Sequence, residues 1–481
     1  MQHIRPGRPH PLHAAAATRS LEARVAEGLP PHTLMQRAGL ATAQLALAIA
    51  PHAQRYWIAC GPGNNGGDGL EAALHLQRWG KQALVTWLAT PESAPADARA
   101  AHARAQAAGV QWLPQPPDSC DFAIDALLGI GASRAPQGRL ADCIARLNAL
   151  PVPVLAVDLP SGLNADTGTP HGACVHATHT LSLLTLKPGL YTAHGRDHAG
   201  QVWLDTLDVD PGLATPQAWL GGPPAASARR HASHKGSYGD VAVIGGAAGM
   251  GGAALLAASA ALHHGAGRVY VALLGDPLTF DPARPELMLR APGALDPAQL
   301  TVVAGCGGGA AIAPELPRLL SAAPRLVLDA DALNALARDE ALHHAVQARR
   351  ARGHATILTP HPLEAARLLR QSTAEVQAQR LTAAQTLADN LQCTVLLKGS
   401  GSIIASPGET PHINPTGNPR LAIGGTGDVL AGILAARWQA DLPAHAVASQ
   451  AAWEHGALAD QWPAQRALIA SALAQAQLQS L

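Results

Sequence analysis

A glycine-rich segment near the C-terminus holds a single acid where it could act on a bound hydroxyl group. Asn414–Gly432 reads NPTGNPRLAIGGTGDVLAG, so Gly424, Gly425 and Gly427 come directly before Asp428. Glycines let a backbone approach a ligand closely, and the apolar residues after Asp428 predict the first turn of a helix. The free N–H groups of such a turn favour an anion, and an acid beside them can accept a proton. The structural alternative is that Asp428 only caps the helix.

Other segments of the second half place polar residues after short apolar runs. Lys398-Gly-Ser-Gly-Ser402 offers amides and hydroxyls to the phosphates or ribose of a nucleotide, but it is not a P-loop, because the GxxxxGK[ST] pattern is absent. His361 lies between two prolines and is expected to be rigid, bound either to a nucleotide or to a backbone partner. Asp329 and Asp331 either shape the floor of a pocket or cap a helix. Ala253 is expected near a helix N-terminus.

The first half contains a second glycine-rich segment, Gly61–Gly69, which reads GPGNNGGDG and leads into a predicted helix. A dinucleotide-binding site would also need an acid after the next strand, about 20 residues on. That strand ends Leu88-Ala-Thr-Pro, so a hydride-transfer dehydrogenase is disfavoured. The oxygens of Asn64, Asn65 and Asp68 suit an alkali cation or a ribose hydroxyl. A tight loop capped by Asp68 is the structural alternative.

Two further strand ends of the first half carry acids. Asp125 ends the run FAID, and Asp158 follows the run VLAV and precedes LPSGLNADTG. In parallel α/β sheets, ligands bind beyond the carboxyl ends of the strands. We therefore expect Asn65, Asp125, Asp158 and Ser161 to converge at one crevice. Lys187 either neutralises the ligand or packs at a strand end.

Short apolar strands alternate with Ala-rich helices in both halves, which predicts parallel α/β folds. The linker candidate is Pro211–Arg230, which is rich in Pro, Gly and Ala. Expected strands are Tyr56–Cys60, Ala83–Leu88, Phe122–Ala126, Val152–Val157, Asp240–Ile244, Arg268–Ala272, Leu300–Ala304, Leu326–Asp329, Thr356–Leu358 and Thr394–Lys398. Expected helices are Ala15–Gly28, Leu70–Trp79, Ala96–Ala108, Leu140–Leu150 and Gly252–His263.

Composition excludes several classes of protein. Charged residues make up 14% of the 481 residues, against about 25% in average usage, and the net charge is zero. With no Lys/Arg run and no long apolar run, neither nucleic acid nor a membrane is an expected partner. The six cysteines are scattered without a CxxC motif, which fits reduced thiols and a cytoplasmic location.

The GGTGD signature at Gly424–Asp428 resembles the ribokinase-like superfamily. Together with TPHPLE (Thr359–Glu364), Lys398-Gly399 and Leu326–Asn334, it looks like the ADP-dependent NAD(P)H-hydrate dehydratases from about Arg230 to the C-terminus. This resemblance implies a ribokinase-like α/β/α domain over residues 225–481 with Asp428 as the catalytic base. It implies substrate binding by Ala253, Gly307, His361 and Asp428, and ADP binding by Lys398, Gly399, Ser400, Gly401, Ser402 and Gly427. Cys306, interpreted as a packing residue, departs from the family's GPGLG pattern.

From about Pro11 to Asp208 the chain resembles the NAD(P)H-hydrate epimerases, in MQRAG, GNNGGDG, DALLGIG, VDLPSGLNADTG and TLKPGL. This implies a Rossmann-like three-layer domain with a parallel sheet over residues 1–218. It implies that potassium is held by Asn65, Asp125 and Ser161. The implied binding residues for the hydrated nucleotide are Asn64, Asn65, Gly66, Gly67, Asp68, Gly129, Ile130, Gly131, Ala132, Ser133, Arg134, Ala135 and Asp158. Ile130 and Asn164 replace the family's usual Thr and Asp.

The two resemblances together imply repair of hydrated NADH and NADPH, in which water has added across the 5,6 double bond to give two C6 epimers. The C-terminal domain is expected to dehydrate the S epimer with ADP, giving AMP and phosphate. The N-terminal domain is expected to interconvert R and S, with Asp158 as the candidate base. Potassium and ADP with Mg²⁺ are the expected ligands, and a homo-oligomer is the expected state. The alternatives are a sugar or vitamin kinase and a nucleotide-sensing protein without activity.

Overall fold

The chain folds into two compact units. The structure, a computed structural model, describes residues 1–132, 134–224, 231–438 and 442–478. The N-terminal unit is Met1–Arg5 with His10–Trp219, and the C-terminal unit is Pro6–Pro9 with Leu220–Leu481. The predicted two-domain α/β architecture is confirmed. The limits 1–218 and 225–481 stay a prediction, and residues 225–230 of the expected linker lie outside the described residues.

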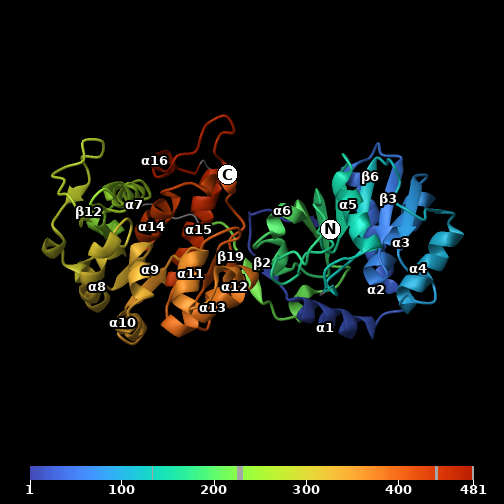
Figure 1. Cartoon of the computed structure of the whole chain (residues 1–481), viewed down its shortest axis with the longest axis horizontal. Helices are drawn as coiled ribbons and strands as arrows, with labels where there is room; N and C mark the ends of the chain where they lie inside the picture. The colour runs from blue at the N-terminus through green and yellow to red at the C-terminus, as the bar shows by residue number, and fades with distance from the viewer. Residues whose placement is uncertain (133, 225–230, 439–441, 479–481) are drawn as a thin grey trace. The chain divides into compact units, whose positions relative to one another are not determined.

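The N-terminal unit is built on one sheet (Figure 1). Its neighbouring strands pair in parallel, except that the edge strand β1 pairs antiparallel with β9. The strands, in their order across the sheet, are β1 (Gln2–His3), β9 (Gln201–Asp205), β8 (His179–Leu183), β7 (Val154–Val157), β6 (Phe122–Ala126), β3 (Arg55–Cys60), β4 (Gln82–Trp87) and β5 (Gln111–Trp112).

Successive residues of strand β3 point to opposite faces of this sheet, and both faces are covered. Tyr56, Ile58 and Cys60 pack with helices α2, α3 and α4, whereas Trp57 and Ala59 pack with α5. The unit is therefore a three-layer α/β domain, as predicted. Its helices are α1 (Ala15–Ala26), α2 (Thr33–Ile49), α3 (Asn64–Arg78), α4 (Ala96–Ala107), α5 (Arg139–Ala149) and α6 (Gly195–Ala199).

Helix α3 begins at Asn64, six residues before the predicted start at Leu70. The polar segment expected as a loop is thus the first turn of this helix. The glycines in this turn are explained by close packing of α3 on the sheet, since a Cβ atom on Gly69 would lie 2.5 Å from the Cβ atom of Ala126. The glycines allow α3 to lie directly on the sheet, which brings the side chains of its first turn to the strand ends.

The C-terminal unit has a mixed sheet. The predicted parallel α/β fold is confirmed for the strands that lie between β13 and β17 in the order across the sheet, which pair in parallel, whereas β18 and β19 add antiparallel pairings at one edge. In order across the sheet they are β13 (Met288–Leu289), β12 (Arg268–Leu273), β11 (Asp240–Gly245), β14 (Thr301–Ala304), β15 (Arg325–Leu328), β16 (Ala355–Leu358), β17 (Thr394–Leu397), β18 (Ile403–Ala405) and β19 (His412–Ile413). Two short strands, β2 (His10–Leu12) and β10 (Ala218–Leu220), come where the chain passes between the units.

Helices cover both faces of the C-terminal sheet (Figure 1). On one face, a core of Val, Leu and Ala is formed by α7 (Gly251–His263), α14 (Thr426–Arg437), α15 (Ala444–Asp460) and α16 (Ala470–Leu473). The other helices are α8 (Leu316–Ala322), α9 (Asp331–Leu336), α10 (Glu340–Ala351), α11 (Pro362–Leu369), α12 (Thr373–Ala378) and α13 (Arg380–Leu391). Helices α7 and α14 approach so closely that a Cβ atom on Gly432 would lie 2.1 Å from the carbonyl oxygen of Ala257.

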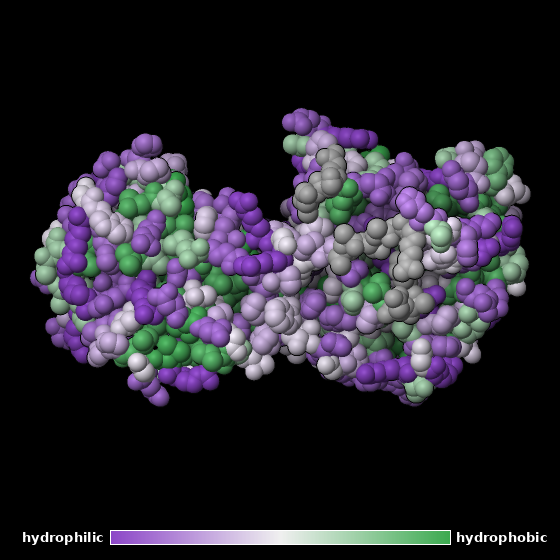
Figure 2. Space-filling view, turned by 180° about the vertical axis from the view of Figure 1, so that it is seen from behind, coloured by the Kyte–Doolittle hydropathy of each residue, from purple (hydrophilic) through white to green (hydrophobic). Residues whose placement is uncertain are grey.

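The surface mixes polar and apolar residues, as Figure 2 shows for one face. Within the part of the chain that the structure describes, no helix has the length and hydropathy needed to cross a membrane.

Candidate active sites

The N-terminal unit contains a cavity of about 680 Å³. Its lining includes these predicted binding residues: Asn64, Asn65, Asp68, Gly129, Ile130, Gly131, Ala132 and Asp158. Gly66 and Gly67 are not part of the lining. They pack against neighbouring residues instead, because a Cβ atom on Gly66 would collide with Gly61 and one on Gly67 would collide with Met35. Arg134 and Ala135 are not part of the lining, and Ser133 lies outside the described residues.

Asp158 is held at the wall of this cavity in a strained conformation. It follows β7 and has a φ of 68°, in the left-handed region that residues other than glycine rarely adopt. Its Oδ1 atom accepts a hydrogen bond from the Leu183 N–H at 3.2 Å and forms an ion pair with Lys187. Lys187 is buried and also donates to the Leu183 carbonyl oxygen at 2.7 Å. The structure thus pairs Lys187 with an acid of the site, and its predicted role toward the ligand stays a prediction.

Asp125 and Ser161 are buried together at the ends of neighbouring strands. Ser161 Oγ donates to Asp125 Oδ1 at 2.6 Å, and the Ser161 N–H donates to Oδ2 at 2.8 Å. Burial raises the pKa of Asp125 to about 6. Among the described residues, no Lys, Arg or His forms an ion pair with Asp125. A buried carboxylate of this kind lacks a countercharge.

Asn65 contacts the loop that follows β6 and Asp125. A Cβ atom on Gly129 would touch the Asn65 side chain at 3.4 Å, and Gly129 lies four residues after Asp125. The Asn65 Nδ2 atom is buried and has no hydrogen-bond partner among the described residues. An unsatisfied buried amide is costly, so its presence at a cavity wall indicates a place for a ligand.

Helix α1 contributes a wall of the cavity that sequence reasoning missed. Thr18, Arg19, Glu22 and Ala26 line it, and these positions recur on one face of a helix. Burial, and next the negative charge of Asp158, raise the pKa of Glu22. The sequence predicts this helix over Ala15–Gly28, but it does not show that one of its faces lines a cavity.

Asp428 lies in the first turn of α14. Gly425 is the residue before the helix, with a φ of 91°, and Asp428 is the third helical residue, so the alternative of a cap formed by Asp428 is wrong. Burial, and next the charge of Asp329, raise the pKa of Asp428 to about 6. A carboxyl group with that pKa can be ionised at neutral pH and can still take up a proton.

Acidic and basic groups from three strand ends surround Asp428. Lys398 Nζ and Thr359 Oγ1 each donate to Asp329 Oδ1 at 2.8 Å. Ligand atoms of Cys306, Asp329 and Asp428 lie within 4.8 Å of one another. Cys306 is therefore a packing residue that also borders the acids, and burial raises the pKa of its thiol. Asp331 accepts the Gly309 N–H at 2.8 Å through its Oδ2 atom, and its charge adds to the rise in the pKa of Asp428.

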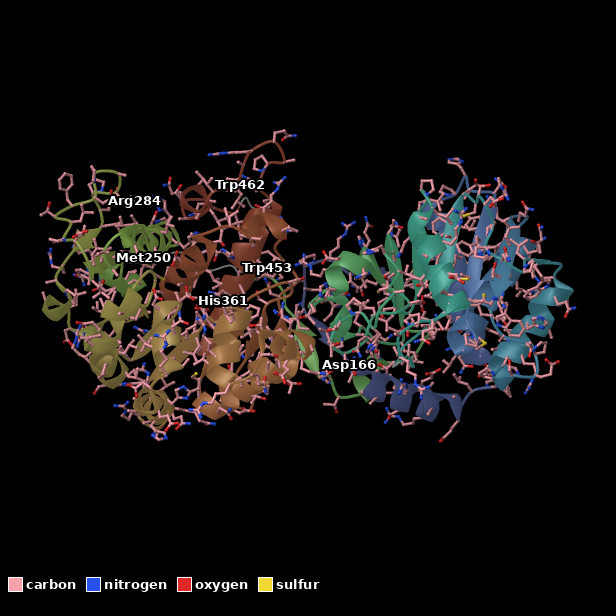
Figure 3. The ribbon with its side chains drawn as sticks, viewed as in Figure 1. Asp166, Met250, Arg284, His361, Trp453 and Trp462 are labelled. Carbon is pink, nitrogen blue, oxygen red and sulfur yellow. The ribbon has the colours of Figure 1, made fainter. Side chains whose placement is uncertain are left out.

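Three more of the predicted residues meet near these groups. A Cβ atom on Gly427 would lie 3.3 Å from Lys398 Nζ and 3.9 Å from Asp329 Oδ2. Gly307 has a φ of 57°, and a Cβ atom on it would lie 2.9 Å from the Cβ atom of Ala253, just after Met250 (Figure 3). Any side chain at position 307 would therefore collide with the start of α7.

His361 caps α11 at its N-terminal end (Figure 3). Its Nδ1 atom accepts hydrogen bonds from the N–H groups of Leu363 at 3.1 Å and Glu364 at 3.3 Å. The alternative of a loop histidine with a backbone partner is thus observed. Its Nε2 atom lies 3.3 Å from Glu364 Oε1, and 46% of the side chain is exposed. A ligand could still reach the outer edge of the ring.

The loop Lys398–Ser402 depends on Arg380, which sequence reasoning also missed. Arg380 is buried, and its guanidinium donates to the Lys398 carbonyl oxygen at 3.2 Å. Gly399 has a φ of 133°, and a Cβ atom on it would lie 2.9 Å from this guanidinium. Ser402 Oγ donates to the Gly399 carbonyl oxygen at 3.1 Å, while Ser400 is exposed. The arrangement turns the loop carbonyls inward.

Comparisons with known proteins cover both units. Residues 31–189 match the family described as YjeF-related protein N-terminus, and residues 241–480 match the family described as NAD(P)H-hydrate dehydratase. The bifunctional NAD(P)H-hydrate repair enzyme Nnr of Escherichia coli strain K12 is 35% identical over 94% of this chain and 90% of its own length. A bifunctional NAD(P)H-hydrate repair enzyme of Leishmania braziliensis is 37% identical over 88% of this chain and 82% of its own length.

Two solved structures resemble about half of the chain. An ADP/ATP-dependent NAD(P)H-hydrate dehydratase from Bacillus subtilis, co-crystallised with ATP and Mg²⁺, is 28% identical, with a TM-score of 0.42, and covers 51% of this chain and 90% of its own. A ribokinase-like superfamily protein from Enterococcus faecalis is 25% identical, with a TM-score of 0.45, and covers 52% of this chain and 88% of its own.

Proposed function

The chain belongs to the family of bifunctional NAD(P)H-hydrate repair enzymes, which carry an epimerase and a dehydratase domain, and we propose that its C-terminal unit dehydrates the S hydrate of NADH and NADPH with ADP, giving AMP and phosphate. The observation that carries this proposal is Asp428, a half-buried carboxyl group in the first turn of α14 with a pKa of about 6. It can remove a proton from the C6 hydroxyl group of the hydrate.

The reaction proceeds in two steps. As Asp428 takes the hydroxyl proton, the C6 oxygen bonds to the terminal phosphorus of ADP, and the bond from that phosphorus to the bridging oxygen breaks to release AMP. The free N–H groups at the start of α14 lie beside Asp428 and stabilise negative charge on the transferred phosphoryl group. Phosphate then leaves C6 with the electron pair of the C–O bond, and loss of a C5 proton restores the double bond.

The nucleotide is placed by the loop Lys398–Ser402 and by Gly427. Lys398 is positioned by Asp329, next to Gly427, so a cation faces the place where the phosphates of ADP would lie. Ala253, Gly307 and the outer edge of His361 are proposed to bind the hydrated nucleotide. Gly307 and Ala253 have no side chain beyond Cβ, so a planar ring bound there would meet only small groups.

Mg²⁺ is proposed to arrive with the nucleotide. The residues do not fit a separate Mg²⁺ site, because the group that includes Cys306, Asp329 and Asp428 contains a thiol, whereas Mg²⁺ requires oxygen ligands. Lys398 already neutralises Asp329 as well. The phosphate oxygens of ADP are the remaining ligands for this ion.

The N-terminal unit is proposed to interconvert the R and S hydrates in its cavity, with Asp158 as the base. A stereospecific dehydratase alone would leave half of the damaged pool untouched. The strained backbone of Asp158 and its ion pair with Lys187 fix one carboxyl group at the cavity wall. A fixed acceptor at the reacting atom is what proton transfer requires.

A potassium ion fits the residues predicted for it. Asp125 is buried without a countercharge among the described residues, Ser161 adds a hydroxyl next to it, and Asn65 adds an amide oxygen at Gly129 in the loop that follows. Oxygen ligands of this kind suit a hard cation. When bound, the ion would supply the missing positive charge and fix the loop after β6 at the cavity wall. A homo-oligomeric state and a cytoplasmic location stay predictions.

Hydrated NADH supplied with ADP tests the dehydratase. We expect the absorbance of reduced nicotinamide to recover and AMP to accumulate in equal amount. Asp428→Asn should abolish recovery and leave ADP binding within about tenfold, because the amide keeps the shape but accepts no proton. A stable phosphorylated product would indicate a kinase instead, and binding without turnover would indicate a nucleotide sensor.

A further inference from the structure

We propose that Glu22 is the general acid of the epimerisation, acting across the cavity of the N-terminal unit from Asp158. The inference rests on the proposed epimerase function of that unit. It adds a residue of α1 to a site that the sequence motifs place only on the loops after β3, β6 and β7.

The shape of the cavity brings these two carboxyl groups to the same space. Glu22 lines it from α1, one turn after Thr18 and one turn before Ala26, which line it too. Leu21, the neighbour of Glu22, is buried in the core and fixes the rotation of the helix. Asp158 lines the same cavity from the loop that follows β7. A ligand that filled the cavity would contact both side chains.

Asp158 and Glu22 have different surroundings, as a base and an acid in one site require. Asp158 is paired with the ammonium group of Lys187. Glu22 has no hydrogen bond or ion pair with any of the described residues. Burial, and next the charge of Asp158, raise the pKa of Glu22, which favours its protonated form. Two carboxyl groups whose environments differ in this way can act as acid and base in one site.

Other charged groups also act on Glu22. Lys187 and Arg19 oppose the rise in the pKa of Glu22, and Asp97 of α4 adds to it. Arg19 donates to the Ile130 carbonyl oxygen at 2.6 Å. Asp68 of α3 also has a raised pKa, because of burial and then the charge of Asp158, so it is the one rival acid that the experiment must separate from Glu22.

The chemistry of the substrate requires one acid and one base. C6 of the hydrate bears a hydroxyl group and is bonded to the ring nitrogen, so epimerisation breaks one of these two bonds and re-forms it on the other face. If the C–O bond breaks, its electron pair goes to oxygen, which takes the proton of Glu22 and leaves as water. Water then adds to the opposite face and gives a proton to Asp158.

If the C–N bond breaks instead, its electron pair goes to nitrogen, which takes the proton of Glu22 while Asp158 removes the hydroxyl proton to give an aldehyde. The nitrogen then attacks the other face of the aldehyde as both protons return. In both routes one proton is given and one is taken, so the product is an isomer of the substrate. The assignment of Glu22 therefore holds for either bond.

The test uses the full-length protein and the purified R hydrate without ADP, so that the dehydratase does not turn over. Chromatography follows the formation of the S hydrate as a function of pH. Glu22→Gln keeps the shape of the side chain and should lower kcat by about 10²–10⁴-fold, with little change in KM. The decline of wild-type kcat/KM at high pH, where the acid loses its proton, should disappear in this variant. Glu22→Asp should restore part of the rate and the decline.

The controls separate this inference from the proposed function. Glu27→Gln, at an exposed position just after α1, should behave as wild type, and both variants should dehydrate the S hydrate normally when ADP is present. An unchanged rate in Glu22→Gln, a change in KM alone, or a high-pH decline that persists there but is lost in Asp68→Asn would overturn the assignment. A wild-type protein that does not interconvert R and S would instead contradict the epimerase function itself.

Discussion

At the scale of single residues, Asp428 predicts how dehydration depends on pH. Its pKa is raised to about 6 from 3.8 by burial and then by the charge of Asp329. The protonated form, which cannot act as a base, therefore accumulates as the pH falls through about 6, where a carboxyl group with an ordinary pKa would remain ionised. We expect kcat/KM for the S hydrate to be constant at higher pH and to fall about tenfold per pH unit below about pH 6.

Glu364 is the control for this profile, because burial raises its pKa to about 7, close to that of Asp428. Glu364→Gln should leave the low-pH decline in place if Asp428 is the base. A decline that disappears in this variant would show that Glu364 titrates in the reaction instead.

Asp125 predicts that epimerisation depends on potassium. Asp125→Asn removes the only full charge among the three proposed ligands, so we expect the potassium concentration needed for half-maximal rate to rise at least tenfold, with weaker substrate binding. Asp118→Asn makes the same charge change at an exposed position of the same unit and should have no effect. Equal rates in potassium, in sodium and without either ion would show that the ion site is misread.

The acids of both sites could be predicted from sequence because each follows a strand or opens a helix. Asp158 and Asp428 carry that local signal. The lysines of the two sites carry no such local signal. Lys187 lies 29 residues after its partner Asp158, and Lys398 lies 69 residues after its partner Asp329. Arg380 and Glu22 were missed for the same reason, because only the packed structure shows what a helix face meets.

At the scale of elements, the packing of α14 on α7 controls where Asp428 lies. A Cβ atom on Gly432 would lie 2.1 Å from the Ala257 carbonyl oxygen, which belongs to the backbone and cannot move aside alone. We expect Gly432→Ala to push α14 away from α7, to lower the free energy of unfolding by about 1–3 kcal/mol, and to reduce dehydration with little change in epimerisation. Chemical denaturation and both activity assays measure these effects.

Gly293→Ala is the matched control, because a Cβ atom there meets nothing within 4 Å and the residue is exposed. It should leave the unfolding free energy and both activities unchanged. If Gly432→Ala had the denaturation midpoint and the dehydratase activity of the wild type, the packing of the two helices would not set the position of Asp428.

The strands were predictable where apolar runs are bounded by turn residues, and β6 is Phe122–Ala126 as expected. The start of α3 was not, because its glycines suggest a loop until the close contact between Gly69 and Ala126 is seen. The antiparallel strands β18 and β19 were not predictable either, because they are too short to show an alternation of apolar and polar residues. Sequence patterns report local preference, and these features depend on contacts between distant segments.

At the scale of the whole molecule, each unit has an apolar core of its own, formed by residues of that unit alone. The sequence did not predict that Pro6–Pro9 belongs to the C-terminal unit. Trp453 Nε1 donates to the Pro6 carbonyl oxygen at 3.2 Å, and a Cβ atom on Gly222 would lie 2.7 Å from Pro9 (Figure 3 labels Trp453). A fragment that lacks Pro6–Pro9 loses these contacts and keeps the core.

We therefore predict that fragments 1–218 and 225–481 fold separately and divide the activities. With a mixture of R and S hydrates and ADP, fragment 225–481 should restore reduced nicotinamide until the S hydrate is consumed, and then continue only at the slow rate of spontaneous epimerisation. Recovery should resume when fragment 1–218 is added, because all proposed dehydratase residues lie in one fragment and all proposed epimerase residues in the other. The C-terminal fragment should unfold at a lower temperature than the same unit in the full chain, since Trp453 loses its partner. Consumption of both hydrates at one rate by fragment 225–481 alone would contradict this division.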